Sequence, residues 1–343
     1  MRRVNILNKK MTIACAIGVM GILIISGVIF IPKLIEHRNQ NQDLEFTTNE
    51  IIELIESDLY FLNLTMDYGF DDYLTNPEAS QKIFSQVEFD YGCTCISILD
   101  PINNSLFGRN FDWYDGGKLI LITQPEDGYK SISMVDLYSL EHYSDINVDE
   151  LSSSEYWRLA FSPFDGMNEW GVGVGCLVSP GMITSEDPVK QNLDSLEFMR
   201  LALDYAKNVS EVIDLWENFD MDYGVGPDVH YMVADAQGNS AVFEWINGEM
   251  EVITNTQPWQ VVTNFRLYNA TEQDQLNCWR FSKVNETLNV VGDSISSSQL
   301  LNLLAEVSQV DFTKWSNVYD LINLKAYITV DRNYNEEPYI FTL

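Results

Sequence analysis

The sequence predicts an α+β fold in which two antiparallel sheets pack together and are covered by helices. Short strand-like runs dominate from Thr94 onward. Turn-forming segments such as PINN and AQGNS join neighbouring runs as hairpins. Helical stretches stand in pairs between the blocks of strands. So many hairpins argue against a parallel sheet, because parallel strands need long crossover connections.

Each predicted element follows from its local pattern. The strand-like runs are, in order, CTCISIL, SLFGRNF, KLILIT, SISMVDL, GVGVGCLV, HYMVADA, SAVFEWI and EMEVIT. Apolar residues at helical spacing predict a helix between Leu193 and Leu203, and Asn208 with Glu211 forms the cap pair of a second helix. A third helix follows the serine run of SSSQLLNLLAEV, and SNVYDLINLKAYITVDRNY predicts a closing hairpin.

The composition is that of a globular, acidic protein. The 343 residues are 46% hydrophobic and 12% aromatic, which excludes a disordered or fibrous chain. Asp and Glu number 51 against 20 Lys and Arg, and the resulting net charge of −31 argues against nucleic-acid binding. Five cysteines are too few for a disulfide scaffold, and three scattered histidines are too few for a zinc site. We therefore expect no metal and no cofactor.

An uncharged run, residues 11–32, follows a short basic segment at the N-terminus. The run is long enough to cross a bilayer as one helix, and basic residues stay on the cytoplasmic side. We expect a membrane anchor, with residues 1–10 in the cytoplasm and the rest of the chain outside the cell. A cleaved signal peptide, which would give a secreted protein, is the alternative.

Residues 33–92 separate this run from the strand-rich body. They begin as a polar stalk, after which Ile51, Ile55 and Leu59 recur every fourth residue with acids between them. That spacing is helical, so we expect a helix-rich leader that runs to about Asp90.

The densest cluster of reactive residue types is DYGCTCISILDPINNSLFGRNFDW. Cys93 follows a glycine, and Arg109 and Asp112 stand at the end of the next strand, beside it in an antiparallel pair. A neighbouring Arg⁺ should lower the pKa of the thiol, and an aspartate can hold an amine by a charge-assisted hydrogen bond. On spacing alone, a buried cysteine beside an ordinary ion pair is the simpler interpretation.

This segment resembles the opening of the choloylglycine hydrolase family of linear amide C–N hydrolases. In that family the Arg of a G-R-N-x-D motif follows a nucleophilic Cys by sixteen residues, and that Cys usually precedes Thr or Ser. Cys93 fits, since 109 − 93 = 16, whereas Cys95 gives 14. Further similar segments follow in the family's order: FDGMNEWGVGVG, HYMVADAQGNSAVFEW, VVTNF, NCWRFSKV and TKWSNVYDLINLKAYI. The resemblance covers about residues 88–332.

The resemblance implies a four-layer αββα fold of the N-terminal-nucleophile hydrolases. In such enzymes the nucleophile is the first residue of the mature chain, and its own α-amine is the general base. The site residues implied are Cys93 as nucleophile, Asp112 to orient the amine, Arg109 and Arg280 to shape the electrostatics, and the Asn264 side chain with the Asn168 backbone N–H to hold the oxyanion.

We therefore expect residues 93–343 to form a cysteine amidohydrolase acting on a non-peptide N-acyl amide. Ninety-two residues precede Cys93, so the chain should cut itself after Gly92, where glycine permits the strained geometry required. The anchor and leader favour a lipophilic amide. Phe265, which departs from the family's pattern after T-N, leaves bile salts and penicillin-like amides open. An acyltransferase and a catalytically silent surface binding protein are the alternatives, and the oligomeric state is not predicted.

Four other residues have structural interpretations. Cys95 is expected to be a small buried residue on the same strand face as Cys93. His230, at the start of a strand, is expected to be a hydrogen-bonded structural histidine. Cys176 and Cys278 are expected to be core thiols, with a disulfide between them as the alternative.

Overall fold

The computed structural model describes side chains and backbone over residues 48–56, 58–75, 92–100, 102, 104–144, 146–185, 187–224 and 226–343, with the side chains of 143 and 144 excepted. Most of the predicted anchor lies outside the described residues. Two short pieces of it are described by their backbone alone, and these are strands, β1 (Ile24–Ile25) and β2 (Val28–Phe30). In the described part of the chain, no helix is long and apolar enough to cross a membrane.

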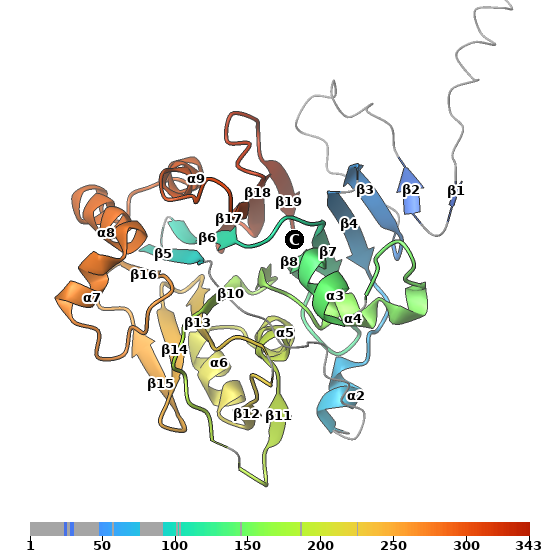
Figure 1. Cartoon of the computed structure of the whole chain (residues 1–343), viewed down its shortest axis with the longest axis horizontal. Helices are drawn as coiled ribbons and strands as arrows, with labels where there is room; N and C mark the ends of the chain where they lie inside the picture. The colour runs from blue at the N-terminus through green and yellow to red at the C-terminus, as the bar shows by residue number, and fades with distance from the viewer. Residues whose placement is uncertain are drawn as a thin grey trace, which may run out of the picture.

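Two packed sheets form the body of the protein (Figure 1). The strands of the larger sheet, which β1 and β2 extend at one edge, are β3 (Ile51–Ile55), β4 (Leu59–Leu64), β7 (Lys118–Thr123), β8 (Ser131–Asp136), β9 (Asp165–Asn168), β10 (Val172–Val178), β13 (Val229–Asp235), β14 (Ser240–Ile246) and β15 (Glu249–Thr254). The strands of the smaller sheet are, in spatial order, β16 (Trp259–Val262), β5 (Thr94–Asp100), β6 (Asn104–Asp112), β17 (Thr313–Asp320), β18 (Lys325–Val330) and β19 (Tyr339–Thr342). The predicted α+β fold with two packed sheets is confirmed, but the larger sheet is mixed and not antiparallel throughout, because β2 pairs parallel with β3 and β4 with β7.

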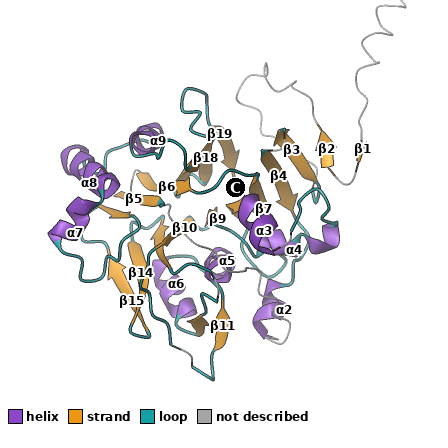
Figure 2. Cartoon of the chain, in the orientation of Figure 1, coloured by secondary structure: helices purple, strands orange, loops and turns teal. Residues whose placement is uncertain are grey.

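Helices pack against both sheets (Figure 2). The larger sheet is covered by α5 (Ser195–Tyr205), with α6 (Val209–Trp216) beside it, and the smaller sheet by α8 (Trp279–Val291) and α9 (Ser297–Glu306). The shorter elements are α2 (Phe70–Thr75), α3 (Leu137–Ser144), η3 (Ser153–Glu155), α4 (Trp157–Ala160), α7 (Glu272–Asn277) and the parallel pair β11 (Gln191–Leu193) and β12 (Phe219–Met221). The predicted cap pair of α6 is present, because the Asn208 side chain accepts the Glu211 backbone N–H at 3.0 Å.

The segment predicted as a helical leader forms strands instead, so that prediction is wrong. β3 and β4 pair antiparallel, and β4 then runs parallel to β7 along its whole length. The runs IIELI and LYFLNL are rich in β-branched and aromatic residues, which fit a sheet buried on both faces. In so short an apolar run, the spacing of four residues typical of a helix cannot be distinguished from the continuous apolar pattern of a buried strand. The only helix described before Cys93 is α2, and residues 76–91 lie outside the described part.

Candidate active site

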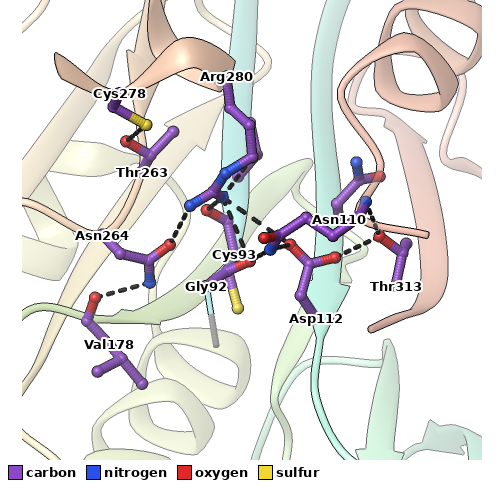
Figure 3. A network of polar contacts seen from close by, with 12 residues as sticks. Gly92, Cys93, Asn110, Asp112, Val178, Thr263, Asn264, Cys278, Arg280 and Thr313 are labelled. Carbon is purple, nitrogen blue, oxygen red and sulfur yellow. Dashed lines mark hydrogen bonds and ion pairs between the residues drawn. The ribbon is translucent and has the colours of Figure 1, made fainter. Parts of the chain in front are cut away.

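Two adjacent strands bring the predicted reactive residues together. Cys93 stands immediately before β5, and β5 pairs antiparallel with β6 so that Cys95 lies opposite Arg109. The same ladder carries Asp112 at the end of β6, beside Cys93 (Figure 3). The local arrangement predicted for Cys93, Arg109 and Asp112 is therefore present.

Arg109 is fully buried and points its guanidinium at the thiol. Its Nη2 lies 3.5 Å from Cys93 Sγ, and its Nε lies 3.5 Å from a carboxylate oxygen of Asp165. Asp165 in turn accepts hydrogen bonds from residues of β17, among them Asn317 at 2.7 Å. At Gly175, an added Cβ would lie 2.8 Å from Arg109 Nη1, so only glycine leaves room for this guanidinium.

Burial has a larger effect on the pKa of the Cys93 thiol than the neighbouring arginine has. Burial raises its pKa above the ordinary value, and the charge of Arg109 only partly opposes that rise. The charge of Asp112 raises the pKa further. The prediction of a lowered thiol pKa is therefore wrong for the uncut chain, in which Cys93 is buried.

Asp112 is held by two side chains from the opposite side of the site. Its carboxylate accepts hydrogen bonds from Gln309 Nε2 at 2.6 Å and from Thr313 Oγ1. Arg280 Nη1 lies 3.8 Å away. Burial raises the pKa of Asp112 to about 6, although these partners favour its ionised form.

The peptide bond between Gly92 and Cys93 lies inside this cluster. The Gly92 carbonyl accepts hydrogen bonds from Gln309 Nε2 at 2.8 Å and Arg280 Nη1 at 3.2 Å. Arg280 also donates to the Cys93 carbonyl. A Cβ at position 92 would lie 2.2 Å from Asn264 Oδ1, so the site closes around a glycine.

Asn264 follows β16 and reaches the same cluster. Its Oδ1 accepts a hydrogen bond from Arg280 Nη2 at 2.9 Å, and its Nδ2 donates to the Val178 carbonyl at 2.7 Å (Figure 3). The backbone before it is held by His230, whose Nε2 lies 2.7 Å from the Thr263 carbonyl.

His230 is buried between two acceptors, as predicted for a structural histidine. Its Nδ1 lies 2.8 Å from Glu244, whose carboxylate also accepts the backbone N–H groups of Leu267 and Tyr268. Burial alone would raise the pKa of Glu244, but the hydrogen bonds from His230 and from the backbone outweigh it and lower that pKa. This pair fixes the loop that carries Asn264.

The side chain of Asn168 is hydrogen-bonded to other parts of the fold. Its side chain donates to the carbonyls of Leu203 and Ala206 at 3.0 and 2.7 Å, and accepts from the backbone N–H groups of the turn after β9. It therefore joins the end of α5 to the end of β9. Two residues of the FDGMN motif contact Arg109, Phe164 through its carbonyl and Asp165 through its carboxylate. The proposed role of the Asn168 backbone N–H in holding the oxyanion stays a prediction.

Several functional candidates were not predicted from the sequence. Gln309 lies in the link between α9 and β17, in a stretch that carries no motif, and Thr313 is the first residue of β17. Asp165 could have been found, because it opens the motif from which Asn168 was chosen.

The remaining cysteines do not extend the site. Cys95, Cys176 and Cys278 are free thiols, so the alternative disulfide between Cys176 and Cys278 is not formed. Burial raises the pKa of Cys95 well above its ordinary value, as expected for a small core residue. Within the described ranges, no group of His, Cys, Asp and Glu side chains could hold a metal ion.

Comparison with solved structures finds proteins with a similar fold. A structure of conjugated bile acid hydrolase from Clostridium perfringens, a mutant, aligns with a TM-score of 0.54 at 17% identity, covering 73% of this chain and 92% of that chain. Penicillin V acylase from Agrobacterium tumefaciens aligns with a TM-score of 0.50 at 18% identity, covering 72% and 84%. No curated protein matches the sequence. The family model of the linear amide C–N hydrolases, choloylglycine hydrolase family, matches residues 93–300, and the chain belongs to that family of hydrolases.

Proposed function

We propose that the protein is a cysteine amidohydrolase that cleaves a linear, non-peptide N-acyl amide through an acyl-thioester at Cys93. One observation carries the proposal. The Gly92–Cys93 peptide bond lies among the groups that would cut it. Arg280 and Gln309 bind the Gly92 carbonyl, and the Cys93 thiol lies beside Arg109. The two packed sheets with helices against both are compatible with the αββα fold of N-terminal-nucleophile hydrolases.

The uncut chain is an inactive precursor in this proposal. The nitrogen of Cys93 is an amide and cannot act as a base. In the cleavage step Cys93 Sγ bonds to the Gly92 carbonyl carbon, the C–N bond breaks, and the nitrogen takes the proton that the thiol gives up. Water then hydrolyses the thioester, leaving a carboxylate on Gly92, the restored thiol and a free amine on Cys93.

Turnover then uses the new amine. Its reference pKa of ~7.7–8 suits a general base near neutral pH, and Asp112 holds and orients it. The amine takes the thiol proton, the sulfur attacks the substrate carbonyl, and the leaving amine departs with that proton. Asn264 Nδ2 has a second hydrogen besides the one bound by Val178, and this hydrogen can bind the oxyanion. Water hydrolyses the acyl-thioester and completes the cycle.

The proposed substrate is an amide whose acyl group is lipophilic. Apolar side chains stand next to the site residues in the chain: Phe265 follows Asn264, and Trp279 precedes Arg280. Trp279 is half exposed, and the rings of Phe265 and Phe281 lie edge to face with 5.3 Å between their centres. Such surroundings favour an acyl chain over a charged group.

A substrate screen with the full-length chain tests the function. N-acyl amides of increasing chain length, a conjugated bile acid and penicillin V are offered in turn, and the N-terminus of the active protein is sequenced. We expect hydrolysis of the lipophilic amides by a chain that begins at Cys93. Transfer of the acyl group to an added amine in preference to water would indicate an acyltransferase. An intact chain without hydrolysis would indicate a binding protein.

We also propose that the leader stays bound after cleavage. Ile51, Ile52 and Leu59 are buried, and β4 is hydrogen-bonded to β7 over its whole length. Each buried apolar side chain contributes roughly 1.5–3 kcal/mol, so several together can hold a separate chain in place. Co-purification of the leader with the cleaved body after gel filtration checks this.

The location of the protein is a separate proposal that depends on the sequence alone. The uncharged run over residues 11–32 would anchor the chain in the cell membrane, with the hydrolase outside. We expect the full-length chain to stay in the membrane pellet after alkaline carbonate extraction and to be degraded by protease added to intact cells. Release into the medium would favour the cleaved signal peptide.

A further inference from the structure

We propose that Gln309 is a catalytic residue of self-cleavage, whose side-chain amide binds the oxygen of the scissile Gly92 carbonyl and stabilises the negative charge that forms there. The inference depends on the proposed cleavage after Gly92. It concerns the processing step, for which Asn264 is not in position.

The geometry is that of an oxyanion hole. Gln309 Nε2 lies 2.8 Å from the Gly92 oxygen, and Arg280 Nη1 approaches the same oxygen at 3.2 Å. Two donors therefore converge on one carbonyl, close to the distance range over which such donors stabilise an oxyanion. Asn264 directs its Nδ2 to Val178 and faces Gly92 with its oxygen, so it does not serve this carbonyl.

Asp112 fixes which end of the Gln309 amide faces the carbonyl. Gln309 Nε2 also donates to Asp112 at 2.6 Å, so the two amide hydrogens are divided between Asp112 and Gly92. A flipped amide would place its oxygen against two acceptors. The carboxylate therefore keeps the donor turned toward the scissile bond.

The main chain of Gln309 is fixed as well. Its backbone N–H donates to Thr313 Oγ1 at 2.8 Å, and its carbonyl accepts the N–H groups of Phe312 and Thr313 at 3.1 and 3.0 Å. The donor is thus held in place before the reaction begins, which is what makes an oxyanion hole effective.

The charge that Gln309 stabilises arises as follows. When Cys93 Sγ bonds to the carbonyl carbon, the π electron pair moves onto the Gly92 oxygen. The Nε2–H of Gln309 and the Nη1–H of Arg280 bind that oxygen. The pair returns when the C–N bond breaks and the nitrogen of Cys93 takes the thiol proton.

The test follows the loss of precursor over time after cell-free synthesis of the full chain, measured by intact mass. Gln309→Met keeps the length of the side chain and removes the donor, and we expect it to slow cleavage about 100-fold. Gln260→Met is the matched control, since it makes the same change in a buried glutamine that bonds Ser240 and the Ile253 carbonyl and does not touch Gly92, so we expect a much smaller effect.

Three results would overturn the inference. Cleavage of Gln309→Met at the wild-type rate would show that the donor is unnecessary. Equal slowing by Gln260→Met would show that the loss of a buried amide, and not of the donor to Gly92, slows cleavage. Should Gln309→Met not fold, as judged by its thermal melt, Gln309→Asn replaces it, since its shorter amide cannot reach the carbonyl, and cleavage at full rate in that variant is equally decisive. A wild-type chain that hydrolyses amides without ever being cut would instead refute the proposed self-cleavage itself.

Discussion

The two ends of the leader are held by different forces. The upstream end, β3 and β4, is an integral part of the larger sheet, with a backbone ladder to β7 and apolar side chains buried in the core. The downstream end, Gly92, is held by hydrogen bonds from Arg280 and Gln309 in a space too small for any side chain. Burial fixes the first end, whereas polar groups arranged around one carbonyl fix the second.

This difference shows which end responds to cleavage. Cutting the bond after Gly92 changes the chemistry of the downstream end and leaves the upstream ladder intact. The mature protein should therefore consist of two pieces that share one sheet. Changes at the downstream end should alter rates, and changes at the upstream end should alter stability.

The largest expected effect is at Cys93. Cys93→Ala should abolish both cleavage and hydrolysis, because the sulfur beside Arg109 is the proposed nucleophile in both reactions. Cys95→Ala, which changes a neighbouring buried thiol, should keep at least part of both. Intact mass and amide hydrolysis measure the two activities, and the reverse result would assign the nucleophile to Cys95.

Gly92→Ala should slow cleavage about 100-fold, because the added Cβ would lie 2.2 Å from Asn264 Oδ1 and 2.6 Å from Arg280 Nη2. Displacing the scissile carbonyl by a fraction of an ångström removes it from its donors. Gly226→Ala is the matched control, since its Cβ would meet a single backbone oxygen at 3.2 Å. Equal rates for the two variants would mean that the downstream end is not tightly held.

At the upstream end, Lys118→Met should lower the free energy of unfolding by about 3 kcal/mol. Lys118 is buried on β7 and joins Asp58 of the leader to Asp331 near the C-terminus, at 2.8 Å from the latter, so its loss leaves two carboxylates unpaired. The measurement uses denaturant unfolding in the uncut Cys93→Ala background. Lys283→Met, which breaks an exposed ion pair, should leave the melting temperature unchanged.

Asp136 should make the stability of the protein sensitive to pH. It lies opposite Lys118 in the ladder, and burial raises its pKa to about 7, above the unfolded value of ~3.9. Its contribution to stability is therefore full below pH ~4 and is lost as the pH rises through about 7. The free energy of unfolding of Asp136→Asn, relative to that of the unsubstituted chain, should therefore rise by about 2 kcal/mol between pH 5 and pH 8. A constant difference across that range would contradict the raised pKa.

Tyr68→Phe should have the smallest effect, about 1 kcal/mol. The Tyr68 hydroxyl donates to the buried Asp204 at 2.6 Å and joins the leader to α5. The variant should therefore release the leader more readily from the cleaved protein, as measured by gel filtration after dilution. Tyr334→Phe removes a similar hydroxyl contact, to Ser316 of β17, which is not part of the leader, and should not change its release.

The fold and the centre of the site could be predicted because their signals are local. The strands β5 and β6 follow from alternating runs around a turn, and one antiparallel pair then places Arg109 and Asp112 beside Cys93. The leader was mispredicted because a short apolar run carries no usable period. Pairing with β7, more than fifty residues later, decides its conformation.

Two further errors have physical causes. The pKa of Cys93 depends on burial, and burial is a property of the assembled protein that spacing to Arg109 does not report. Gln309 belongs to no motif, since it reaches the site only because β17 pairs with β6.

The contacts of Gly92 have a consequence for the timing of maturation. Its carbonyl is bound by residues 188 and 217 positions further along the chain. Contacts of such sequence separation form late, because closing long loops costs entropy before the contacts stabilise the fold. A chain that ends after α9, or one stalled on the ribosome at that point, lacks Gln309 and with it a donor for the scissile bond. Under the proposed mechanism, cleavage therefore requires that the chain has finished folding. Only folded molecules gain the free amine on Cys93 and become active hydrolases.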